Sequence, residues 1–173
     1  MPDTLSVRPA RALRVLGIDP STVGTGRALL VAEGSRETVE TLGVFAPPGA
    51  NLDEKLDAAF DWMVEVIAFT KPDALAIETP FFKLNAQTMF TLASLGAVYR
   101  LAATRAGLPV IEIPPAKRCV AVGLAGNASK DQVRYTVNAV YGLDLTDHNM
   151  ADAVAIAAAG ALQLRMQAMT RGD

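Results

Sequence analysis

The feature that most constrains this chain is a short apolar run at residues 13–18, with Arg14 near its start, that stops at Asp19 and is followed by a loop containing Gly24. Such a run, bounded by charged and turn residues, is typical of a buried strand that ends in a tight loop. Residues 27–32 resume the apolar pattern, and residues 38–45 alternate between apolar and polar positions. The chain is therefore expected to open with three strands joined by short turns into an antiparallel meander.

The rest of the chain alternates between helical and extended patterns. Two more short apolar runs, at residues 74–77 and 110–113, are bounded by prolines or charges and predict two further strands. The predicted helices span residues 53–69, 85–106, 116–122, 130–141 and 149–166. Strands that alternate with helices after an antiparallel opening indicate an α/β fold with a mixed five-stranded sheet flanked by helices.

Length and composition limit the class of protein. A chain of 173 residues, 51% of them hydrophobic, is large enough to bury the core of one globular domain. Cys119 is the only cysteine, which excludes an internal disulfide and a zinc site of paired thiolates and favours a cytoplasmic location. Residues 1–12 hold no apolar run of signal-peptide length, and the apolar stretch at residues 150–162 is shorter than the roughly 20 residues that span a bilayer. We therefore expect residues 1–12 to form a flexible N-terminal arm, and we expect no membrane anchor.

The charge balance gives no overall sign of a nucleic-acid partner. The formal net charge is −2 and the isoelectric point is near 5.4, whereas proteins that bind nucleic acids usually carry a basic surface. Any surface that binds DNA must therefore be local. A cluster of metal-binding carboxylates would itself lower the net charge, so mild acidity does not exclude such a surface.

Three acids stand at positions where a charge is costly. Asp19 and Glu78 each end an apolar strand, and Asp152 interrupts the apolar helix predicted at residues 149–166. If the two strands are neighbours, their carboxylates meet at one edge of the sheet. The alanines around Asp152 would let its helix pack closely on the sheet and direct this acid at the other two. Carboxylate oxygens gathered in this way are the ligands that Mg²⁺ requires.

Each of these acids also has a purely structural interpretation, in which it binds no metal. Asp19 would cap a turn, Glu78 would be a solvent-exposed loop acid, and Asp152 would interact with the dipole of its helix at the N-terminal turn. A covalent nucleophile is not indicated, because His148 is the only histidine and the chain lacks a plausible Ser-His or Cys-His pair.

Four segments, taken in order, carry a resemblance to a known family. They are GIDPSTVGTG, AIETPFFKLNA, a basic helix followed by GNASK, and HNMADAVAIA, and together with the elements between them they cover residues 13–163. The chain resembles the RuvC family of Holliday-junction resolvases, which have a ribonuclease-H-like fold. The resemblance implies a homodimer that resolves four-way DNA junctions by paired nicks in recombination and repair, with a branch-migration helicase as a candidate partner. It also implies a nuclease domain over residues 13–166 and a C-terminal tail over residues 167–173.

The resemblance implies roles for individual residues. The metal ligands of the family correspond to Asp19, Glu78 and Asp152, which would hold two Mg²⁺ or Mn²⁺ ions about 4 Å apart for an in-line displacement. Phe81 corresponds to an aromatic that stacks on a base exposed at the junction. The candidate contacts to DNA phosphates are Lys83, Lys117, Arg118 and Lys130, although exposed helices and loops commonly carry such charges without binding DNA.

A fourth metal ligand is expected one helical turn before Asp152. The family usually has an acid or a histidine three residues before this aspartate, whereas this chain has Asn149 there. Asn149 and His148 both share a helical face with Asp152, and Asp147 does not. We take Asn149 as the ligand, since its amide oxygen can coordinate Mg²⁺, with His148 as the alternative.

Two other functions fit parts of the sequence. GIDPSTVGTG also resembles the first phosphate loop of ATP-binding modules of the actin and sugar-kinase superfamily, but the second phosphate loop and second domain of those proteins are not evident. A non-catalytic junction-binding protein of the same fold is the closer alternative, because Asn149 replaces the usual acid or histidine. A nicking assay on a four-way junction separates these interpretations.

Overall fold

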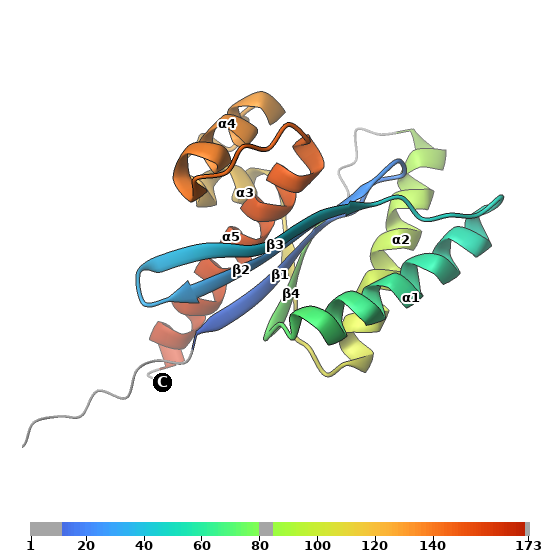
Figure 1. Ribbon diagram of the computed structural model, residues 1–173, viewed down its shortest axis with the longest axis horizontal. Coiled ribbons are helices and arrows are strands. Elements are labelled where there is room, and N and C mark those ends of the chain that lie inside the picture. Colours follow the sequence, from blue (N-terminus) through green and yellow to red (C-terminus); the bar gives the residue numbers. More distant parts are fainter. Residues whose placement is uncertain (1–11, 80–84, 172–173) are drawn as a thin grey trace, which may run out of the picture.

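A computed structural model describes residues 12–79 and 85–171 (Figure 1). The strands are β1 (Leu13–Asp19), β2 (Thr25–Glu33), β3 (Arg36–Phe45), β4 (Ala74–Glu78) and β5 (Val110–Ile113). The helices are α1 (Leu52–Thr70), α2 (Ala86–Arg105), α3 (Pro115–Ala121), α4 (Lys130–Tyr141) and α5 (His148–Arg171). Each strand and helix predicted from the sequence is present, in the predicted order.

The strands form one mixed sheet in the order β3-β2-β1-β4-β5. The first three strands pair antiparallel, as the predicted meander requires, whereas β4 runs parallel to β1 and β5 runs parallel to β4. This confirms the predicted mixed five-stranded sheet. It also makes β1 the central strand and puts the C-terminal ends of β1 and β4 side by side.

Helices cover both faces of the sheet. Figure 1 shows α1 and α2 on one face and α5, with α3 and α4, on the other. The side chains of β1 alternate between two cores: Leu16 and Ile18 pack with α1 and α2, and Val15 packs with α5. The part of a strand that is buried on both faces must be apolar, which explains the run at residues 15–18 that follows the half-buried Arg14.

Small residues let α5 lie close against the sheet. A Cβ atom added at Gly17 of β1 would overlap the backbone oxygen of Ala153, and one added at Gly26 of β2 would overlap the backbone oxygen of Asn149. Farther along the helix, a Cβ added at Gly160 would collide with the side chain of Ala76 in β4. Larger residues at these positions would push α5 away from the sheet, so the glycines set the depth of its N-terminal turns.

The most apolar stretch of the chain is the buried part of α5. Residues 151–161 are all buried, Asp152 included. Within the residues that the structure describes, no helix has the length and apolar character needed to cross a bilayer.

The end of α5 differs from the prediction. The apolar pattern predicts an end near residue 166, but the helix continues to Arg171. Residues 167–171 are exposed, so no apolar periodicity marks them in the sequence. Just before this segment, Arg165 donates hydrogen bonds to Glu37 at 2.9 Å and to the carbonyl of Gly34 at 2.8 Å, which ties the helix to the β2–β3 hairpin.

Candidate active site

Three acids from three elements meet at the C-terminal edge of the central strands. Asp19 is the last residue of β1 and Glu78 is the last residue of β4, and the residues before them, Ile18 and Ile77, are partners in the parallel ladder. Asp152 lies one turn into α5 and is fully buried. Asp19 interacts electrostatically with both other acids. The structure therefore brings together the three residues that the sequence suggests as metal ligands.

Burial raises the pKa of both strand-end acids. Asp19 is 6% exposed, and its burial, together with the negative charges of Glu78 and Asp152, holds its pKa well above the ordinary value. Burial likewise raises the pKa of Glu78, although the positive charge of Arg118 opposes this shift. Like charges this close in a buried site require cations nearby.

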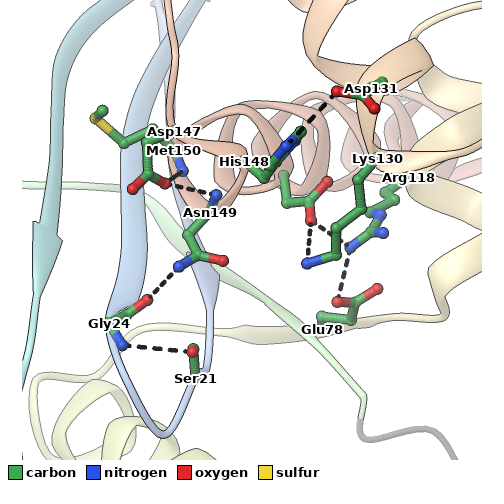
Figure 2. A network of polar contacts seen from close by, with 11 residues as sticks. Ser21, Gly24, Glu78, Arg118, Lys130, Asp131, Asp147, His148, Asn149 and Met150 are labelled. Carbon is green, nitrogen blue, oxygen red and sulfur yellow. Dashed lines mark hydrogen bonds and ion pairs between the residues drawn. The ribbon is translucent and has the colours of Figure 1, made fainter.

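Two basic side chains lie among the acids (Figure 2). Nη1 of Arg118 lies 2.9 Å from Oε2 of Glu78 and 3.2 Å from Oδ2 of Asp152. Nζ of Lys130 lies 3.3 Å from the same Asp152 oxygen. The side chain of Arg118 is 10% exposed, whereas that of Lys130 is 57% exposed. Arg118 thus bridges β4 and α5 from within, and Lys130 reaches the cluster from the solvent side.

The position of Arg118 differs from the expected phosphate contact at the surface. Arg118 and Cys119 form the buried face of α3, so the guanidinium is directed inward, while Lys117 is exposed. Lys117 lines a separate groove between α3 and the C-terminal half of α5. Neighbouring residues on a helix point about 100° apart, and Lys117 and Arg118 therefore do not form one basic strip.

A capping box fixes the start of α4 and, with it, the place of Lys130. The hydroxyl of Ser129 accepts a hydrogen bond from the backbone N–H of Gln132 at 3.2 Å, and the backbone N–H of Ser129 donates to Oε1 of Gln132 at 2.8 Å. Lys130 follows as the first residue of the helix. The GNASK segment therefore places an ammonium group beside the acids.

The two candidates for a fourth ligand have different partners (Figure 2). Asn149 donates from Nδ2 to the carbonyl of Gly24 at 2.9 Å, so its amide oxygen points away from that carbonyl. His148 instead faces Asp131 of α4, with 3.6 Å between Nε2 and Oδ1. Asp147 accepts from the backbone N–H of Asn149 at 2.7 Å and caps α5. Of these residues, Asn149 lines the cleft onto which Asp19 and Glu78 open.

That cleft has a volume of about 270 Å³ and contains Asp19, Glu78, Lys130 and Asn149 in its walls. Hydroxyl-bearing residues complete much of its polar surface: Ser21, Thr22, Thr79 and Thr88. Hydroxyl groups donate hydrogen bonds to phosphate oxygens in many DNA complexes. The cleft thus combines an acidic centre with a polar, partly basic rim.

The acids suit a divalent cation through their unpartnered oxygens. Oε1 of Glu78 and Oδ1 of Asp152 are buried and accept no hydrogen bond, while the other oxygen of each carboxylate faces Arg118. Hard cations such as Mg²⁺ prefer carboxylate oxygens. Across residues 12–79 and 85–171, however, no three histidine, cysteine, aspartate or glutamate side chains are arranged to hold one metal ion. In this arrangement Arg118 and Lys130 supply the positive charge.

Phe81 and Lys83, two of the predicted DNA contacts, lie outside the described residues. The residues that flank this segment are anchored. The backbone N–H of Thr79 donates to the carbonyl of Ile113 at 3.1 Å, and Asn85 caps α2 by accepting from the N–H of Thr88 at 2.9 Å. The roles suggested for Phe81 and Lys83 stay predictions.

The fold and the site together define a nuclease of the ribonuclease-H-like fold. Its features are an antiparallel meander, a strand that runs parallel to the central strand, acids at the ends of both of these strands, and a third acid on the helix that crosses them. A family model described as "Crossover junction endodeoxyribonuclease RuvC" matches residues 15–160. The chain belongs to the RuvC family. This confirms the enzyme class and the fold suggested by the sequence.

Individual relatives agree with this assignment. The crossover junction endodeoxyribonuclease RuvC of Rubrobacter xylanophilus is 36% identical over 159 residues, which are 90% of this chain and 89% of the relative. The solved structure of Thermus thermophilus RuvC has a TM-score of 0.79 and 27% identity, over 90% of this chain and 97% of that one. The T. thermophilus RuvC solved with a Holliday junction substrate has a TM-score of 0.81 and 26% identity, over 90% and 96% of the two chains.

Proposed function

We propose that this protein resolves four-way DNA junctions and that its reaction centre is the cluster of Asp19, Glu78 and Asp152. The observation that carries the proposal is the convergence of these acids, from β1, β4 and α5, at a cleft that Asp19, Glu78 and Lys130 line and behind which Asp152 is buried. The T. thermophilus relative has been solved with a Holliday junction substrate. Because the chain belongs to the same family and is similar to it over 90% of its length, we infer the same class of substrate.

The residues in and around the cluster would have different roles in phosphodiester hydrolysis. Bound Mg²⁺ or Mn²⁺, two ions per site, would activate the attacking water and stabilise the leaving 3′ oxygen. Asp19, Glu78 and Asp152 would supply the anionic oxygens for these ions, and Asn149 would supply a neutral one. Arg118 holds the carboxylates of Glu78 and Asp152 in fixed positions, at 2.9 and 3.2 Å. Lys130 stands at the solvent side, where a phosphate of the substrate would enter.

Paired nicks also imply two copies of the chain. The described residues of one chain form one such cluster, and symmetric cuts in two strands need two clusters related by a two-fold axis. We therefore infer a homodimer. The helix α2 is a candidate for its interface, because Phe90 and Leu101 are 61% and 47% exposed there. A branch-migration helicase stays a predicted partner.

The decisive experiment is a nicking assay with a synthetic four-way junction in Mg²⁺, compared with a linear duplex of the same arm sequences. We expect paired nicks in the junction and none in the duplex. Binding without nicking in either Mg²⁺ or Mn²⁺ would support the non-catalytic alternative. The family assignment disfavours the ATP-binding module, and absence of ATP binding in the same preparation is the expected companion result.

Asn149 is expected to tune the metal requirement. Asn149→Ala removes a ligand and should raise the Mg²⁺ concentration for half-maximal nicking. Asn149→Asp adds a charge and should lower it, although a carboxylate cannot donate to the Gly24 carbonyl and the loss of this hydrogen bond should cost about 1 kcal/mol of stability. Metal titrations and thermal unfolding measure the two effects separately. If titrations respond to His148→Ala and ignore both changes at Asn149, the ligand is His148.

Phe81 is expected to matter most where a base pair must be opened. Phe81→Ala should slow nicking of a fully paired junction more than nicking of a junction with unpaired bases at the crossover. Stacking of an aromatic ring on a base is worth roughly 1–3 kcal/mol, which corresponds to about a five- to 150-fold difference between the substrates. Equal losses on both substrates would exclude a stacking role.

A further inference from the structure

A second pocket continues the cleft away from the acids. It has a volume of about 260 Å³ and shares Thr22 and Thr88 with the cleft that contains Asp19 and Glu78. Its walls come from the β1–β2 loop, the β3–α1 loop, the first turn of α1 and the N-terminal half of α2. A DNA strand that extends from the acids in this direction would reach the second pocket without leaving the surface of one chain.

The chemistry of the second pocket differs from that of the acidic cleft. Its lining contains no acid, and its one charged residue, within the described part of the chain, is Lys55. The amide of Gln87 and the hydroxyls of Thr22 and Thr88 add hydrogen-bond donors. Such a surface suits an anion that is held directly, whereas the first cleft needs a metal ion before an anion can approach.

Lys55 has no evident structural task. No acid stands three or four residues before or after it in α1, and it takes part in none of the ion pairs among the described residues. A lysine in the first turn of a helix also opposes the helix dipole, so its charge does not stabilise α1. What this lysine does provide is a positive charge in the wall of the pocket.

The start of α2 adds to this positive field. The first turn of α2 has no acidic residue, whereas that of α1 has Asp53 and Glu54. Backbone N–H groups at the start of a helix favour anions, and Gln87 belongs to this turn, whereas the N–H of Thr88 is donated to the Asn85 cap. This field supports the lysine and the hydroxyl groups but does not define the site without them.

We propose that the second pocket binds a backbone phosphate of the DNA strand that enters the acidic cleft, with Lys55 as its principal contact. The inference rests on the proposed function, since it names where the substrate continues beyond the reaction centre. It assigns a DNA contact to a residue on α1, a helix to which neither the sequence motifs nor the acidic cluster gave a role.

The test compares Lys55→Gln with Lys71→Gln in the full chain. Both variants remove one positive charge at an end of α1. Lys55 lies in the first turn of the helix, whereas Lys71 is its C-cap, roughly 24 Å away at 1.5 Å per residue. Junction binding is measured in EDTA, where no strand is cut, as a function of salt. We expect Lys55→Gln to weaken binding about three- to tenfold at 0.1 M salt and to reduce the slope of log K against log salt by about one, with Lys71→Gln unchanged.

A chemical substitution in the DNA locates the contact. Replacing single phosphates by uncharged methylphosphonates should weaken wild-type binding at one or two positions at which Lys55→Gln shows no further loss. A wild-type protein that nicks the junction while Lys55→Gln keeps the full salt slope overturns the second pocket and leaves the proposed function intact. A wild-type protein that neither binds nor nicks the junction overturns the proposed function and this inference with it.

Discussion

Asp152→Asn is expected to abolish nicking of a four-way junction, with a loss of about three orders of magnitude or more in rate. The substitution keeps the volume of the side chain and removes its charge. Because Asp152 is fully buried, it contacts no phosphate, and junction binding in EDTA should equal or slightly exceed that of the wild type. Single-turnover cleavage of a labelled junction and binding in EDTA measure the two effects. Asp19→Asn and Glu78→Gln should behave in the same way, and near-normal nicking by any of the three would remove that residue from the site.

Removing the charge of Asp19 should stabilise the metal-free protein. The pKa of Asp19 is raised by burial and by Glu78 and Asp152, so the folded state binds a proton at Asp19 more tightly than the unfolded state does. The contribution of Asp19 to stability therefore falls as the pH rises above its unfolded-state pKa of about 3.9, and the penalty is largest at neutral pH. Asp19→Asn should raise the melting temperature at pH 7 in EDTA, and this gain should shrink as the pH falls towards 4.

The exposed acid Asp61 provides a matched control, because Asp61→Asn changes the net charge equally without touching the cluster. Its melting temperature should follow that of the wild type across the pH range. Added Mg²⁺ should stabilise the wild type and Asp61→Asn and have little effect on Asp19→Asn. Equal melting temperatures for Asp19→Asn and Asp61→Asn at pH 7 would mean that the acids are not under electrostatic strain in the metal-free protein.

The strands that end in Asp19 and Glu78 could be predicted from the sequence, because strands that are buried on both faces leave apolar runs. The acids that end two of these runs, Asp19 and Glu78, were therefore visible as strand-end residues. Their proximity depends on β1 and β4 being parallel neighbours, which the runs do not show. The resemblance to the RuvC family supplied that link, and the ladder that pairs Ile18 with Ile77 accounts for it physically.

Other parts depend on long-range contacts that leave little trace in the local sequence. The apolar pattern predicts that β2 starts at residue 27, yet the strand begins at Thr25, whose buried hydroxyl forms a hydrogen bond of 2.8 Å with Tyr99 of α2. The sequence does not predict the inward direction of Arg118, because α3 has only 7 residues, too few for a clear apolar periodicity. One signal was available: buried acids that lie together require a buried cation, and Arg118 adjoins the apolar Cys119.

Arg118 links Glu78 to Asp152, and its removal is expected to have a large effect on stability. Arg118→Ala is expected to destabilise the metal-free protein by about 3–5 kcal/mol, because it leaves Glu78 and Asp152 buried without their main counter-charge. For a chain of this size, such a loss lowers the melting temperature by roughly 6–20 °C. Arg118→Lys keeps the charge but not the planar guanidinium and should recover part of the loss. Millimolar Mg²⁺ should recover part of it for Arg118→Ala, since the metal supplies charge to the same oxygens.

Two further measurements separate this internal role from the phosphate contact expected from the sequence. If Arg118 acts on the acids, Arg118→Ala combined with Glu78→Gln should be more stable than Arg118→Ala alone, because the second change removes one of the uncompensated charges. If Arg118 instead contacts DNA, Arg118→Ala should melt within a few degrees of the wild type and lose about one unit of salt slope. The burial of the guanidinium and its position between two carboxylates favour the first result.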